Sequence, residues 1–310
     1  MEKTKIKVTL TIIYTGIVRF INIISGFLLV GVIINLYGAE TYGKYIYSLA
    51  VINFPLFIMA GVSKLILKAV NGQGSTFGKG IDLNNDALIS VIRDSVAYVS
   101  FVFLLLFFVG SLLELEGLVY APFIFIFLFV SNFLFALLIA QGKPVLASTS
   151  EAFISLCRFA CIFLFLFIFT DDTILQGFLI GQCVGLLVTF YFFVRMEVFR
   201  GIAFSKIPIR YSYIKENFNF FISSLGLGAI WRIFSSVDKF IVESIAGLSL
   251  LAVYAVITTI SGRLVEVANT VVQVVSPKFF ISEKSSKADA YILKFSHAFN
   301  VFFFIAFIFL

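Results

Sequence analysis

Long apolar segments recur along the whole chain, and they constrain its fold more than any other feature. A helix needs about 20 predominantly apolar residues to cross the roughly 30 Å hydrocarbon core of a bilayer. Hydrophobic residues make up 61% of the chain and charged residues only 13%, a composition that a soluble domain could not bury. The alternating short segments of a transmembrane β-barrel do not occur. The sequence therefore predicts an all-α polytopic membrane protein.

The hydropathy pattern predicts about nine transmembrane helices, in two groups. The expected spans are 9–36, 45–62, 92–113, 118–140, 146–169, 174–194, 217–236, 248–275 and a short final one from about 295. We expect residues 1–194 to form a six-helix lobe, 195–216 a basic cytoplasmic loop, and 217–310 a partial second lobe. Because the final span has only about 15 residues before Leu310, we expect this second lobe to be truncated.

The distribution of lysine and arginine predicts the orientation in the membrane. Seventeen of the 23 basic residues fall in the N-terminal segment or near the loops after the second, fourth, sixth and eighth spans, whereas only Lys44 and Lys239 fall on the other side. Basic residues collect in cytoplasmic loops, so we expect a cytoplasmic N-terminus. The net charge of +6 then fits a face near anionic lipid and requires no nucleic-acid partner.

The remaining four basic residues are arginines inside predicted helices: Arg19, Arg158, Arg232 and Arg263. A charge at membrane depth costs at least about 2.5 kcal/mol, so it normally faces a bundle interior or a wet cavity. A guanidinium is also suited to bidentate binding of phosphate or carboxylate. We therefore predict that these arginines line a cationic substrate cavity; structural ion pairs and snorkelling side chains are the alternatives.

Polar residues accompany three of the arginines at helical spacing, which places them on the same helix face. These stripes are Thr15, Gly16, Asn22 and Gly26 around Arg19; Ser148, Glu151 and Ser155 before Arg158; and Thr259, Glu266 and Thr270 around Arg263. We predict that Asn22 joins the substrate site. Glu151 and Glu266 are expected to pair with the arginines on their faces, with coupling to a cation as the alternative role. Polar contacts between helices are the alternative for the stripes themselves.

A short repeat relates the two predicted groups of helices. Gly38–Tyr45 reads GAETYGKY and Gly247–Tyr254 reads GLSLLAVY, so glycine and tyrosine are seven residues apart in both, with an offset of 209 residues. Each segment follows the first helix of its group. The pattern predicts a parallel pseudo-repeat about an axis along the membrane normal.

Motifs for catalysis or metal binding are not evident in the sequence. The three cysteines, Cys157, Cys161 and Cys183, lie in predicted spans without His or carboxylate partners, which favours packing over a metal site. His297 is the only histidine. We therefore expect no enzymatic activity, no cofactor and no metal.

Two segments resemble a known family. RFINIISGFLLVGVIINLYGAETYGKYIYSLAV, residues 19–51, resembles the first helix pair of polysaccharide (O-antigen) flippases of the multidrug/oligosaccharidyl-lipid/polysaccharide exporter superfamily. SSVDKFIVESIAGLSLLAVYAV, residues 235–256, resembles the start of their second half. The resemblance in hydropathy and loop pattern covers nearly the whole chain. Members of the family usually have twelve or more helices in two lobes, so this sequence departs from them by ending near the ninth.

The resemblance implies a flippase of the bacterial cytoplasmic (inner) membrane. Such a protein moves undecaprenyl-pyrophosphate-linked oligosaccharide repeat units to the outer leaflet by alternating access, for O-antigen or capsule biosynthesis. The implied partners are the lipid-linked oligosaccharide and membrane lipid, together with a polysaccharide polymerase and a chain-length regulator. The substrate suits the predicted cavity, because arginines would neutralise its diphosphate while its polyprenyl tail stays in lipid.

Three other functions remain as alternatives. An ion-coupled exporter of the same superfamily would share the fold, although a site for cationic drugs would favour carboxylates over arginines. A membrane-bound polysaccharide polymerase or glycosyltransferase would need a large extramembrane loop, whereas the predicted outside loops have about a dozen residues or fewer. A non-transporting fragment that scaffolds other assembly proteins is the third alternative.

Overall fold

The structure is a bundle of long helices. The computed structural model describes residues 2–71, 86–112, 118–168, 174–196 and 212–282, and its regular secondary structure there is helical throughout. The elements are α1 (Glu2–Asn53), η1 (Phe54–Ile58), α2 (Met59–Asn71), α3 (Asp86–Leu112), η2 (Leu118–Tyr120), α4 (Ala121–Ala140), α5 (Pro144–Ile168), α6 (Ile174–Arg195), α7 (Tyr213–Glu216) and α8 (Phe218–Ser282). The predicted all-α fold is confirmed, while the predicted final span lies outside the described residues.

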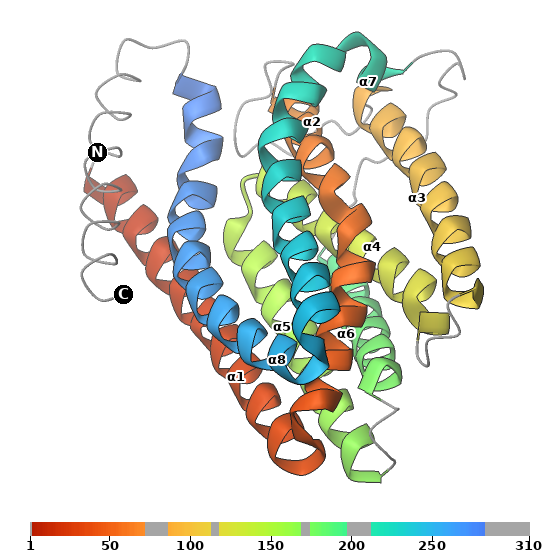
Figure 1. Cartoon of the computed structure of the whole chain (residues 1–310). Coiled ribbons are helices and arrows are strands. Elements are labelled where there is room, and N and C mark those ends of the chain that lie inside the picture. The colour runs from red at the N-terminus through yellow and green to blue at the C-terminus, as the bar shows by residue number, and fades with distance from the viewer. Residues whose placement is uncertain (1, 72–85, 113–117, 169–173, 197–211, 283–310) are drawn as a thin grey trace.

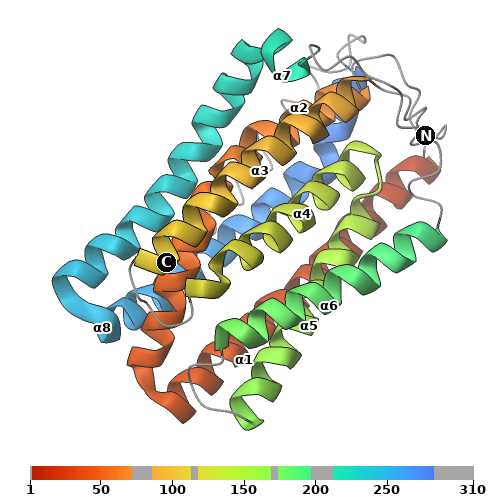
Figure 2. The same ribbon diagram turned by 90° about the vertical axis from the view of Figure 1, so that its right-hand side faces the viewer.

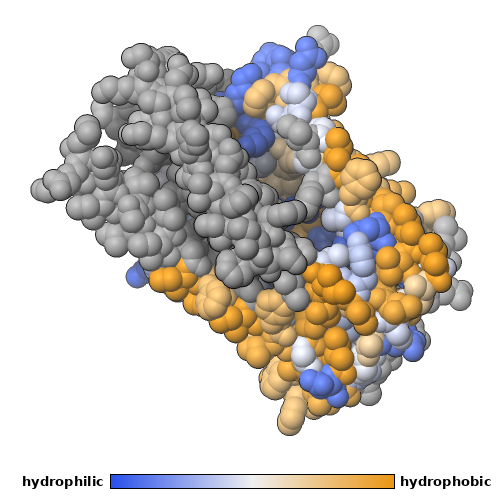
Figure 3. Space-filling view, turned by 60° about the vertical axis from the view of Figure 1, so that its left-hand side comes forward, coloured by the Kyte–Doolittle hydropathy of each residue, from blue (hydrophilic) through white to orange (hydrophobic). Residues whose placement is uncertain are grey.

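Within the described residues, six helical segments are long and apolar enough to cross a membrane. They are Ile24–Val70, Ala87–Phe108, Ala121–Ala140, Pro144–Ile168, Ile174–Arg195 and Phe218–Thr259. Many of their large apolar side chains point outward, and Figure 3 shows a broad apolar surface, with polar residues at its upper and lower ends and a smaller polar patch between them. An outward apolar surface of this extent suits lipid rather than water, as expected of a multi-pass membrane protein.

Two of these segments contain a reversal of the chain at a glycine. Gly38 (φ 89°, ψ 168°) interrupts α1, and Gly247 (φ 77°, ψ 175°) interrupts α8. Only glycine adopts this backbone region readily, since it has no Cβ. Figure 1 shows each of these two segments descending, turning and rising again. α1 and α2 therefore form one helical hairpin, and the parts of α8 before and after Gly247, its first and second limbs, form another. The two glycines of the predicted repeat therefore share one backbone conformation.

The helices extend further into these reversals than the sequence predicts. The expected loops around Gly38 and Gly247 are helical on both sides of the glycine, so the predicted helix end at 236 is wrong. Asp238 and Lys239 lie in the first limb of α8, with Lys239 Nζ 3.7 Å from Asp238 Oδ1. Tyr254 Oη, on the second limb, donates to Asp238 Oδ2 at 2.6 Å. The ion pair and the hydrogen bond offset the free-energy cost of having the charged side chains of Asp238 and Lys239 in an apolar, membrane-spanning helix.

The two hairpins pack closely against each other. A Cβ atom at Gly43 would lie 2.1 Å from the carbonyl oxygen of Leu248, so only glycine fits there. Beside it the rings of Tyr47 and Phe240 meet edge to face, with centroids 5.5 Å apart. α1 also runs along α5, where the hydroxyl of Tyr37 donates to the carbonyl of Leu166.

One end of the bundle carries the turn between α4 and α5 together with α7, and we call it the connection face (Figures 1 and 2). Gly142 (φ 70°) ends α4, donating to the Ile139 carbonyl while Lys143 N donates to the Leu138 carbonyl, each at 2.9 Å. This is the Schellman arrangement, in which a left-handed glycine satisfies the last carbonyls. Pro144 then begins α5, where its missing N–H costs nothing.

α7 docks on α3 at the connection face and so sets where α8 begins. Ser212 caps α7, accepting from Lys215 N at 3.3 Å while its hydroxyl donates to Asp94 Oδ2 at 2.7 Å. The backbone N of Tyr213 donates to Ser90 Oγ at 2.9 Å. Burial, and then the negative charge of Glu216, raise the pKa of the Tyr213 phenol above its usual value.

Candidate functional site

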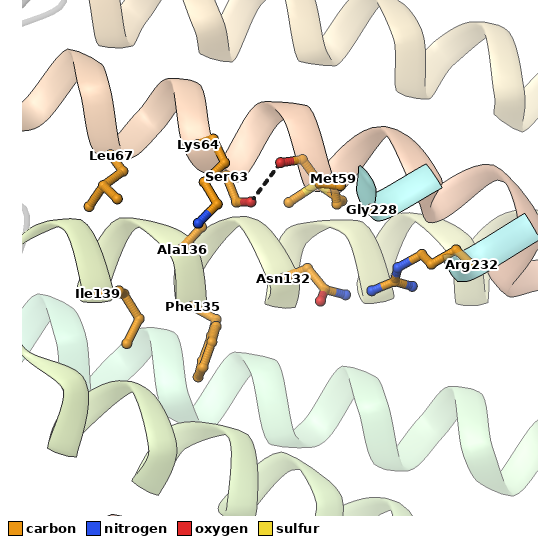
Figure 4. A pocket seen from close by; sticks show the side chains of 11 residues that line it. Met59, Ser63, Lys64, Leu67, Asn132, Phe135, Ala136, Ile139, Gly228 and Arg232 are labelled. Atoms are coloured by element: carbon orange, nitrogen blue, oxygen red, sulfur yellow. Dashed lines mark hydrogen bonds between the residues drawn. The ribbon is translucent and has the colours of Figure 1, made fainter. Parts of the chain in front are cut away.

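A cavity of about 460 Å³ lies between α2, α4 and the first limb of α8 (Figure 4). Each helix contributes one face, because its lining residues recur at intervals of three or four positions. The lining residues are Met59, Ala60, Ser63, Lys64 and Leu67 of α2; Asn132, Phe135, Ala136 and Ile139 of α4; and Gly228 and Arg232 of α8.

Two positive charges face this cavity. Lys64 is exposed, whereas Arg232 is partly buried. The other described lining residues are neutral, so the described part of the wall carries no carboxylate to balance them. A cleft whose charges are of one sign and whose walls are of low dielectric attracts an anion more strongly than the same charges would in bulk water.

Two neutral side chains contribute oxygen acceptors. Ser63 Oγ donates its hydrogen to the Ala60 carbonyl at 3.2 Å, and Asn132 Nδ2 donates to the Leu128 carbonyl at 2.7 Å. Because both donate to their own helix, Ser63 Oγ and Asn132 Oδ1 keep lone pairs for a ligand. The wall thus combines cationic donors with neutral acceptors, which suits an anion that also carries hydroxyl groups.

A close helix crossing forms one wall of the cavity. A Cβ atom at Gly228 would lie 2.1 Å from the Cβ of Ala60, so α2 and α8 come together at these two residues. Gly61, the residue after Ala60, faces the ring of buried Phe221, which lies two turns before Gly228 and which a Cβ at Gly61 would approach to 2.5 Å. The small residues let the two helices pack in direct contact at the crossing, as is usual between membrane helices. The cavity therefore lies beside this contact, between α2, α8 and α4.

Lys68 joins α2 to the start of α8 at the connection face. Its Nζ donates to Asn217 Oδ1 at 2.8 Å and lies 4.7 Å from the ring centre of Phe220. Lys68 therefore binds protein groups at the start of α8, while Lys64, one turn earlier, lines the cavity.

Of the predicted site residues, Arg232 lines the cavity and Arg158 does not. The guanidinium carbon of Arg158 lies 5.2 Å from the ring centre of Phe178, whose ring is 6.4 Å from that of Tyr45. A Cβ at Gly181 would lie 2.5 Å from Arg158 Cα. Arg158 thus lies at the crossing of α5 and α6 beside the first hairpin, where a cation–π contact stabilises its charge.

The other predicted site residues do not line the cavity in the part of the chain whose side chains are described. Glu151 lies on α5 with an exposed side chain. The predictions for Arg19, Asn22, Arg263 and Glu266 concern side chains outside the described part, although their backbones belong to α1 and α8.

Lys64, Ser63 and Asn132 are cavity residues that the sequence prediction missed. The hydropathy pattern ended the second span at 62 and left Lys64 among the loop charges, but α2 continues to Asn71. A usable signal was present, since Ala60, Ser63, Lys64 and Leu67 share one face in helical spacing.

Comparisons with known proteins identify the fold only. No protein-family model matches the chain, and no curated protein matches it. A solved structure described as "protein A" has a similar fold, with a TM-score of 0.72 and 13% sequence identity over 96% of this chain and 71% of that chain.

Proposed function

We propose that the protein is a flippase-like transporter, which moves a lipid-linked oligosaccharide with a phosphate or diphosphate head group across the bacterial inner membrane by alternating access. The observation that carries the proposal is the cavity between α2, α4 and α8, with Lys64 and Arg232 in its wall and no carboxylate among its described lining residues. The resemblance of residues 19–51 and 235–256 to polysaccharide flippases points in the same direction.

The chemistry of the wall supports this class of substrate. Lys64 and Arg232 would bind the phosphate oxygens with charge-assisted hydrogen bonds. Ser63 Oγ, whose hydrogen is donated to the Ala60 carbonyl, and Asn132 Oδ1, an amide oxygen that can only accept, would accept hydrogen bonds from sugar hydroxyls. The cavity carries the polar part of the substrate past the hydrocarbon, while a polyprenyl chain would stay in lipid.

The packing of the helices supports a transport cycle of the alternating-access kind. The first limb of α8 contacts α2 where Gly228 lies against Ala60, and the second limb contacts α1 where Leu248 lies against Gly43. α8 therefore contacts the first hairpin at two separate places. A rocking motion of α8 about such contacts would widen the cavity toward one side of the membrane and then toward the other.

The test is complementation of a bacterial strain that lacks its own polysaccharide flippase. We expect the full chain to restore surface polysaccharide, and Lys64→Ala and Arg232→Ala each to reduce it strongly at equal membrane abundance. Arg19→Ala and Arg263→Ala extend the same test to the predicted residues outside the described side chains. Lys44→Ala is the matched control, because Lys44 lies away from the cavity in an exposed pair with Glu40 at 3.6 Å.

The proposal fails if the full chain restores nothing, or if Lys64→Ala and Arg232→Ala both work as the unmodified chain does. Resistance to cationic drugs without restored polysaccharide would instead favour an ion-coupled exporter.

A further inference from the structure

We propose that Lys64 and Arg232 act one after the other on the same anion, with Lys64 capturing it near the connection face and Arg232 holding it deeper in the cavity. The inference rests on the proposed function for the identity of the transported anion. It adds an order of events and a separate role for each cation.

The crossing of α2 and α8 provides the reference level. Ala60 and Gly228 touch there, and both cations lie four residues further along their helices. α2 runs toward the connection face, where Lys68 contacts Asn217, while α8 begins at that face and runs away from it. Four residues span about 6 Å of helix, so the backbones of the two cations lie at levels about 12 Å apart.

The residues between the two cations line the same cavity. Figure 4 shows Asn132 between the Lys64 and Arg232 side chains, with Leu67 and Ile139 beyond Lys64. Ser63, next to Lys64, and Asn132, near Arg232, each offer an oxygen acceptor. An anion bearing hydroxyl groups would therefore meet one cation and one acceptor at each of the two levels.

The two cations also differ in burial, and this difference assigns their roles. Lys64 is exposed and Arg232 is partly buried. An exposed charge at the rim of a site acts mainly on the association rate and its salt dependence, whereas a buried charge that contacts the ligand acts mainly on the dissociation rate. Lys64 therefore sets capture and Arg232 sets retention.

The experiment measures both rate constants with inorganic pyrophosphate as the probe. The full chain is purified into phosphatidylcholine nanodiscs, and binding is followed by stopped-flow fluorescence of Trp231, the only tryptophan, which precedes Arg232. Equilibrium dialysis of labelled pyrophosphate measures occupancy independently. The variants are Lys64→Gln and Arg232→Gln, with Lys64→Arg and Arg232→Lys as charge-retaining versions.

We expect Lys64→Gln to lower the association rate constant about fivefold and to flatten its salt dependence, with dissociation changed less than about twofold. Arg232→Gln should raise the dissociation rate constant about tenfold or more, with little effect on association. Lys64→Arg should restore association, and Lys44→Gln should leave both rates unchanged.

The inference is overturned if both glutamine variants change the same rate constant, if Lys64→Gln leaves association unchanged, or if the unmodified chain binds no pyrophosphate. Its failure is distinguishable from that of the proposed function. Failed complementation with the two rate effects intact would leave a two-step anion site that does not flip lipid. Successful complementation with both variants acting on dissociation would overturn the order of events alone.

Discussion

Gly43 and Gly228 show how single residues set the distance between helices in this protein. Each lies where a Cβ atom would fall 2.1 Å from an atom of the neighbouring helix, the Leu248 carbonyl oxygen in one case and the Ala60 Cβ in the other. Such close approach increases van der Waals contact, which drives helix association where lipid provides no hydrophobic force. The second of these contacts, between Gly228 and Ala60, forms part of the cavity wall.

Replacing Gly43 by alanine should therefore destabilise the fold. The added methyl group meets backbone atoms of Leu248 that cannot rotate away, so we expect a loss of about 1–3 kcal/mol, the usual cost of overpacking. Thermal unfolding in detergent, followed by Trp231 fluorescence, measures it. Gly31→Ala is the matched control, because a Cβ there has nothing within 4 Å and alanine favours a helix. Equal midpoints for the two variants would contradict the expectation.

At the scale of elements, the hairpins depend on the reversals at Gly38 and Gly247. Both residues adopt positive φ with ψ near 170°, and both have open space around the missing Cβ. Their requirement for glycine is thus conformational, unlike that of Gly43, which is steric. The Tyr254–Asp238 hydrogen bond then joins the limbs of the second hairpin.

Gly38→Ala and Gly247→Ala should each lower the free energy of unfolding by about 1–3 kcal/mol, since alanine is strained in this backbone region. Gly226→Ala is the control in α8, as it has open space and no positive φ. The same melting assay applies to all three variants. Unchanged midpoints in the first two would mean that the reversals tolerate side chains, and the conformational argument would be wrong.

At the scale of the whole molecule, the described basic residues gather mainly at the connection face. Lys68, Lys143 and Lys215 lie near it, whereas Lys44 lies beyond the first reversal with Glu40 as its partner. If basic residues mark the cytoplasmic side, the connection face is cytoplasmic, and the Lys64 end of the cavity faces the cytoplasm.

Cysteine labelling tests this orientation. In a variant in which Cys157, Cys161 and Cys183 are replaced by serine, Lys143→Cys should react with a membrane-impermeant maleimide only in inside-out vesicles, and Lys44→Cys only in right-side-out vesicles. Both substitutions lie on exposed side chains, so access depends on the side of the membrane. Reversed labelling would place the N-terminus outside, and labelling of both from one side would refute the membrane crossing between them.

Much of the fold was predictable, because a transmembrane helix depends on the apolar character of neighbouring residues. The spans of α4, α5 and α6 agree with the hydropathy pattern to within a few residues. The pattern failed at α2, where Lys64 and Lys68 end the apolar run although the helix continues to Asn71. Lys68 is accommodated there by Asn217 and Phe220, which are too distant in the chain for any local pattern to include.

The sequence predicted that the candidate site would contain arginine, but it did not predict which other residues would line the site. An arginine at membrane depth must avoid lipid, so its spacing with other polar residues indicates an inward face without naming the neighbour. Arg232 shares a cavity with Asn132 and Lys64, whereas Arg158 contacts Phe178 at a helix crossing. Helices and their inward faces follow from residues a few positions apart. The partners across the bundle depend on close approaches such as Gly228 to Ala60, where segments far apart in the chain come into contact only through packing.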